Sequence, residues 1–89
     1  MLVDRDIQRI FEDLGCKRHS VNGIDTFEKD GVFYRLPYVK GLNAYVIETA
    51  DSLDEAKKNR FEDDDTIEII DDKGEMIYTI KKMLSEYYL

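Results

Sequence analysis

The apolar residues near both ends of the chain recur at the spacing of an α-helix. Residues 5–14 are predicted to form one helix, which Gly15 ends. Residues 75–88 are predicted to form a longer helix with a wider apolar face. That face consists of Met76, Ile77, Ile80, Met83, Leu84 and Tyr87. The alternative is a hairpin turn at residues 72–74 followed by a strand over residues 76–80, and the pattern leaves it open.

Between these two segments the pattern changes to the alternation of β-strands. Residues 24–29 and 32–38 flank Asp30-Gly31, a pair that supplies the positive φ of a tight hairpin turn. In the second run Tyr34 and Leu36 share the expected core side, whereas Phe33 and Arg35 point the other way. Residues 44–47 are apolar at every position, which is typical of a central strand covered on both faces. These three runs predict a three-stranded antiparallel meander.

The remaining segments complete an α+β fold. Residues 16–23 are interpreted as a turn-rich connection. Ser52 and Glu55 have capping-box spacing and predict a middle helix, and residues 66–70 are predicted to form a fourth short strand. We therefore expect a single domain over residues 1–89, with the N-terminal, middle and C-terminal helices packed on one face of the sheet.

Composition and charge exclude several classes of protein. The 89 residues carry a net charge of -7, whereas duplex-DNA or RNA binders and proteins that dock on anionic membranes need a basic surface. The single cysteine, Cys16, permits no internal disulfide. Charges at Asp4, Arg5 and Asp6 interrupt the first apolar residues, so neither a signal peptide nor a membrane span is expected. A cytoplasmic location follows as an expectation.

Negative charge is concentrated in one segment of the chain. Residues 51–75 hold 11 acidic and 4 basic residues, and the densest run is Glu62-Asp63-Asp64-Asp65, followed by Glu68. One interpretation is a solvated loop that only keeps the protein soluble. The other is a docking surface for a basic protein, because such a field accelerates association. Tyr38 and Tyr45 are weaker candidates for aromatic anchors in that interface.

No pattern typical of an enzyme or a cofactor site is present. Cys16, His19 and Ser20 lie close together in the sequence without a recognisable catalytic signature, and one Cys with one His is too few for zinc. An EF-hand loop from Asp64 to Glu75 would need glycine where Ile69 stands. At most, Asp63 to Asp65 could form an adventitious divalent-cation site. We therefore expect no enzyme activity, no resident metal and no cofactor.

The segment from Phe33 to Asp65 resembles small immunity proteins of bacterial polymorphic-toxin systems, whereas the chain from Ile67 onward departs from that pattern. The residues that carry the resemblance are Phe33, Leu36-Pro37-Tyr38, Ala44-Tyr45-Val46-Ile47-Glu48, Ala50, Glu55-Ala56, Asn59 and Phe61-Glu62-Asp63. The resemblance implies a non-enzymatic acidic binder that neutralises a toxin made in the same cell, and it implies no catalytic residues.

Two other functions are compatible with the residues. One is an acidic nucleic-acid mimic that blocks a DNA- or RNA-binding protein without binding nucleic acid itself. The other is a regulatory or structural subunit that self-associates through a sheet edge. We expect a monomer or a weak homodimer.

Overall fold

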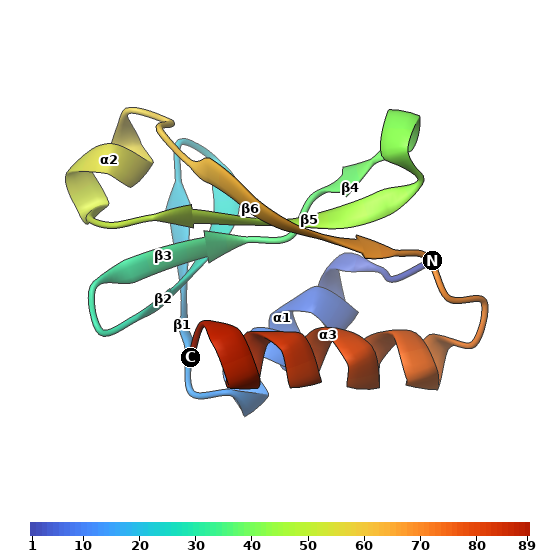
Figure 1. Ribbon diagram of the computed structural model, residues 1–89. Coiled ribbons are helices and arrows are strands. Elements are labelled where there is room, and N and C mark those ends of the chain that lie inside the picture. Colours follow the sequence, from blue (N-terminus) through green and yellow to red (C-terminus); the bar gives the residue numbers. More distant parts are fainter.

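The computed structural model describes all residues from Met1 to Leu89. It contains one antiparallel sheet and three α-helices, so the predicted α+β class is confirmed (Figure 1). In chain order the elements are α1 (Asp4–Asp13), β1 (Lys17–Val21), β2 (Ile24–Lys29), β3 (Val32–Arg35), β4 (Tyr38–Val39), the 3-10 helix η1 (Lys40–Leu42), β5 (Ala44–Ala50), α2 (Leu53–Lys57), β6 (Glu62–Glu68) and α3 (Lys73–Tyr87).

β5 is the central strand of the sheet, as its continuous apolar run predicts. Strands β1, β2, β3 and β5 pair in that order, and the pairing of β2, β3 and β5 confirms the predicted meander. β5 also pairs with β4 and, along residues 44–49, with β6. Because a strand has only two sides, β3 and β4 share one side of β5, and β6 takes the other. β1 and β6 are therefore edges of the sheet, and the outer side of the two-residue β4 is unpaired as well.

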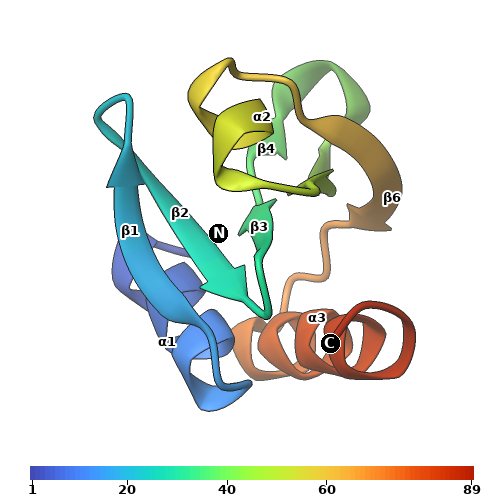
Figure 2. The same ribbon diagram turned by 90° about the vertical axis from the view of Figure 1, so that its left-hand side faces the viewer.

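The larger core lies between the sheet and the pair α1 and α3 (Figures 1 and 2). Phe11 of α1 stacks on Phe27 of β2, with ring centroids 4.6 Å apart. Ile80 and Leu84 of α3 are fully buried in the same cluster. Because burial of apolar side chains is the dominant stabilising contribution, this face supplies most of the stability of the fold.

The smaller core lies on the opposite face, beneath α2 (Figure 2). It comprises Val21, Phe33, Ala50 and Ala56, with Phe61 packed against them. The expectation that all helices share one face is therefore wrong for α2. The five-residue α2 brings only Ala56 to a buried position, and Leu53 remains 44% exposed.

Local turn and cap signals in the sequence operate as expected. Asp30 and Gly31 have φ values of +53° and +84° in the β2–β3 turn, a conformation that glycine adopts without steric cost. The side chains of Ser52 and Asp72 accept hydrogen bonds from the backbone amides of Glu55 and Glu75, which caps α2 and α3. The long C-terminal helix is thereby confirmed, and the alternative hairpin at this position is wrong.

Three segments differ from the sequence prediction. The single strand predicted over residues 32–38 is interrupted at Leu36-Pro37 and forms β3 and β4, because proline has no amide to donate to a strand ladder. The stretch interpreted as a turn-rich connection contains β1, which forms a second hairpin with β2 through Asn22-Gly23. Cys16, just before β1, is only 7% exposed and belongs to the larger core. The fourth strand is not residues 66–70 but Glu62–Glu68, so it includes the entire acidic run. Pairing with β5 decides both the presence and the start of this strand, and aspartate by itself disfavours strands.

Candidate protein-binding edge

The five acidic residues selected from the sequence all lie on β6, at an edge of the sheet. Glu62, Asp63, Asp64, Asp65 and Glu68 are each exposed, and Ile67 is the single buried residue of the strand. β6 pairs only with β5, so its outer side presents backbone donors and acceptors to solvent. The interpretation of the run as a loop is therefore wrong, and the carboxylates are held on a regular strand.

A β-bulge distributes these carboxylates over both faces of the sheet. Ile47 lies opposite Asp65 and Glu48 lies opposite Asp63, which leaves Asp64 as the extra residue. Asp65 accepts a hydrogen bond from the Tyr88 hydroxyl, and Asp64 accepts one from the Thr49 hydroxyl at 2.6 Å. Burial, followed by the contact with Asp65, raises the pKa of the Tyr88 phenol far above its usual range. Tyr88 therefore remains a hydrogen-bond donor to β6.

No cationic side chain neutralises the β6 carboxylates. The structure contains five ion pairs, and their acidic partners are Glu28, Asp54, Glu55, Asp6 and Asp13. Lys58 and Arg60, the nearest bases before β6 in the sequence, pair with α2 residues instead. The negative field of β6 is thus uncompensated within the chain. A row of charges on an edge strand also prevents uncontrolled strand pairing, which is its purely structural interpretation.

A row of three charged residues crosses the sheet from β6 toward β3, and it could not be identified from the sequence. In the strand register Arg35 lies opposite Glu48, and Glu48 lies opposite Asp63, which places the three across β3, β5 and β6. Burial, and then the neighbouring carboxylate of Asp63, raises the pKa of Glu48, whereas Arg35 lowers it. The row joins the exposed strand to the interior of the protein.

Arg35 is the best-anchored charged residue of the protein and is only 8% exposed. Its guanidinium group donates hydrogen bonds to Thr26 (3.1 Å), Asn59 (2.9 Å) and the Val21 carbonyl (3.4 Å), and it lies 4.1 Å from the ring centroid of Phe61. Burial lowers the pKa of this guanidinium, which nevertheless stays charged at neutral pH. Alternation along β3 predicts that Arg35 lies on the face of the sheet away from the larger core. Alternation alone could not predict that the smaller core covers Arg35 on that face.

The two tyrosines proposed as anchors occupy different environments. Tyr38 and Tyr45 form an edge-to-face pair with ring centroids 5.7 Å apart. Tyr45 is only 2% exposed and its hydroxyl accepts the Leu2 amide, so its assignment to a partner surface is wrong because core packing already covers the ring. Tyr38 is half-buried and donates to Asn43 at 2.8 Å, so it stays a candidate.

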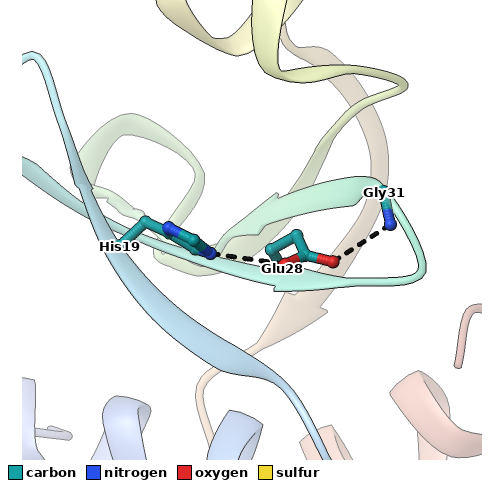
Figure 3. Close-up of polar contacts among 3 residues, drawn as sticks. All are labelled: His19, Glu28 and Gly31. Carbon is teal, nitrogen blue, oxygen red and sulfur yellow. Dashed lines mark hydrogen bonds and ion pairs between the residues drawn. The ribbon is translucent and has the colours of Figure 1, made fainter.

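The sheet separates the residues considered for nucleophilic chemistry. His19 is on β1, not in a turn, and its Nε2 lies 3.3 Å from Oε1 of Glu28 (Figure 3). Oε2 of Glu28 accepts the Gly31 amide at 3.0 Å, and this bond, followed by the contact with His19, lowers the pKa of Glu28. The His19 ring packs on Phe33 on the α2 side, whereas Cys16 lies in the core on the other side. Burial also raises the pKa of the Cys16 thiol, which reduces its nucleophilicity.

The acidic strand does not assemble a set of metal ligands. No group of three or more His, Cys, Asp or Glu side chains is arranged to hold a metal ion, and the bulge separates Asp63 from Asp64 and Asp65. The adventitious cation site considered for these three residues is therefore not formed. None of the helices combines the length and the hydropathy that crossing a lipid bilayer requires. Comparison of the chain with protein-family models, curated proteins and solved structures gives no match.

Proposed function

We propose that this protein is a non-enzymatic binding module, an immunity-type inhibitor that neutralises a cognate toxin through the acidic edge strand β6. The observation that carries this proposal is the set of five exposed carboxylates on β6 without a single ion pair. The resemblance of residues 33–65 to immunity proteins supports the same function, since Glu62 and Asp63 belong to both features.

The partner of such a strand is a protein with a basic surface. Uncompensated charge on a rigid element attracts an oppositely charged surface over about one Debye length, roughly 10 Å at 0.1 M salt. The carboxylates of β6 should therefore act mainly on the association rate and on its salt dependence. Half-buried Tyr38, by contrast, should act on the dissociation rate if it belongs to the interface.

The first experiment identifies the partner and then measures its binding. The protein is used to capture partners from its native cell, and captured proteins are identified by mass spectrometry. Association of the purified partner is then followed by stopped flow across a salt series. We expect the triple variant Asp63→Asn, Asp64→Asn, Asp65→Asn to associate about tenfold more slowly at low ionic strength, as is typical of electrostatic steering.

A matched variant controls for the loss of net charge. Asp30→Asn, Asp71→Asn, Glu86→Gln removes three charges from other exposed positions, and its association rate should change by less than about threefold because the charges are dispersed. Equal association rates for the two triple variants would contradict the proposal. Displacement of the captured partner by DNA or RNA would instead identify the chain as a nucleic-acid mimic. Concentration-dependent sedimentation of the protein alone would favour self-association.

A further inference from the structure

A second candidate site lies away from β6, in a pocket of about 410 Å³. It opens between the first turns of α1, the start of β2 and the Leu36-Pro37 link between β3 and β4. The strand register explains where this pocket lies, because the pairing of β2 with β3 ends at Phe27 and Tyr34. Beyond Arg35 the chain turns to pair with β5 through β4. Residues 24–26 therefore have no strand on that side, and the pocket occupies the space.

The walls of this pocket are largely apolar. Ile7 of α1, Phe27 of β2 and Leu36 line it, and all three belong to the larger core or pack against it. Ile24 also lines the pocket and remains 49% exposed. The pocket is thus an opening into the edge of the apolar core, and a ligand with an apolar body would remove this surface from water.

The acidic groups of the pocket are two carboxylates without a cationic partner. Asp4 and Asp25 both line it, and neither takes part in any of the five ion pairs of the protein. Alternation along β2 places Asp25 on the same side as Phe27, toward α1. Arg35 lines the pocket as well, but its guanidinium group is engaged by Thr26, Asn59 and the Val21 carbonyl.

We propose that this pocket binds a small amphiphilic amine. Its ammonium group would lie between the carboxylates of Asp4 and Asp25, and its apolar body would rest on Ile7, Phe27 and Leu36. The volume lies within the range of small-molecule sites, which combine apolar walls with a few polar groups that orient the ligand. The inference is independent of the proposed inhibitor function, because no β6 residue lines the pocket.

The experiment titrates the ¹⁵N-labelled protein with two probes of the same shape, 2-phenylethylammonium and uncharged 2-phenylethanol. We expect the amine to shift the backbone amide signals of Ile24, Asp25 and Leu36, with a Kd on the order of 1 mM for so small a ligand. The alcohol should bind about fivefold or more weakly at low salt, since it lacks the charge that the carboxylates attract. Equal affinity for the two probes would overturn the proposal, as would amine shifts spread over the whole acidic surface.

Two variants of equal charge locate the effect. Asp4→Asn, Asp25→Asn should abolish the preference for the amine over the alcohol. Asp30→Asn, Asp71→Asn alters two exposed carboxylates outside the pocket and should retain the preference. Unchanged amide spectra outside the substituted positions verify that both variants fold. Retention of the preference in the first variant would overturn the assignment of Asp4 and Asp25. None of these results depends on the toxin partner, so this proposal and the proposed function can fail separately.

Discussion

The two faces of the sheet differ in the number and the polarity of the side chains that they bury. The face beneath α1 and α3 buries a cluster of twelve residues, nearly all apolar, with aromatic stacking at its centre. The face beneath α2 buries only four apolar residues and continues into the polar row of Arg35, Glu48 and Asp63. Apolar contacts tolerate many arrangements, whereas buried charges require matched partners at defined positions. The first face therefore stabilises the domain, and the second connects its interior to the acidic strand.

The largest effect is expected on the apolar face. Leu84→Ala removes a fully buried side chain from the cluster and should lower the free energy of unfolding by about 3–4 kcal/mol, the usual cost of such a cavity. Because a domain of this size has a total stability on the order of 5 kcal/mol, much of the variant should be unfolded under mild denaturing conditions. Urea denaturation followed by circular dichroism measures the change. Tyr87→Ala, on the same helix but at a residue 72% exposed, is the control and should cost less than about 0.5 kcal/mol.

A somewhat smaller loss is expected on the polar face. Arg35→Met keeps much of the side-chain length but leaves Thr26, Asn59 and the Val21 carbonyl without their donor, and Glu48 without its cation. We expect a cost of about 2–3 kcal/mol, since breaking a buried charge network leaves its partners unsatisfied. Addition of Glu48→Gln should recover part of that loss. A cost for Arg35→Met within experimental error of zero would show that the network contributes nothing to stability.

The smallest effect depends on pH and concerns Glu48. Its pKa in the folded protein is raised above the ordinary value of 4.5, so the native state holds this proton more tightly than the unfolded chain does. Its contribution to stability is therefore complete below that ordinary value and is lost as the pH rises through the folded pKa. Glu48→Gln cannot ionise and should gain stability relative to the wild type as the pH rises above 4.5.

Urea denaturation of both proteins from about pH 4 to pH 7 tests this dependence on Glu48. The two nearest charged neighbours, Asp63 and Arg35, remain in both proteins, so the difference between the curves isolates residue 48. A difference that stays constant, or that shrinks with rising pH, would contradict a raised pKa at this position.

The acidic residues of the candidate edge were found from the sequence because charge is a property of the residues themselves. The arrangement of these residues on a strand was not predicted, because aspartate has a low strand propensity and a run of Asp is typical of a loop. Pairing with β5 overrides that propensity, and the bulge at Asp64 depends on the alignment of both strands. Glu48 and Arg35 were missed for a related reason. Alternation along the predicted strand indicated the face of Arg35, but only the register places Arg35 opposite Glu48.

The sequence by itself determined the features whose causes act within a few residues. The Asp30-Gly31 turn and the cap at Ser52 belong to this class, whereas the pattern left the choice between a helix and a hairpin after residue 72 open. Only the tertiary structure decided that residues 17–21 form an edge strand, that α2 covers the opposite face and that Tyr45 is buried. These features depend on hydrogen bonds and contacts between segments far apart in the chain, and their free energies appear only once the strands are aligned.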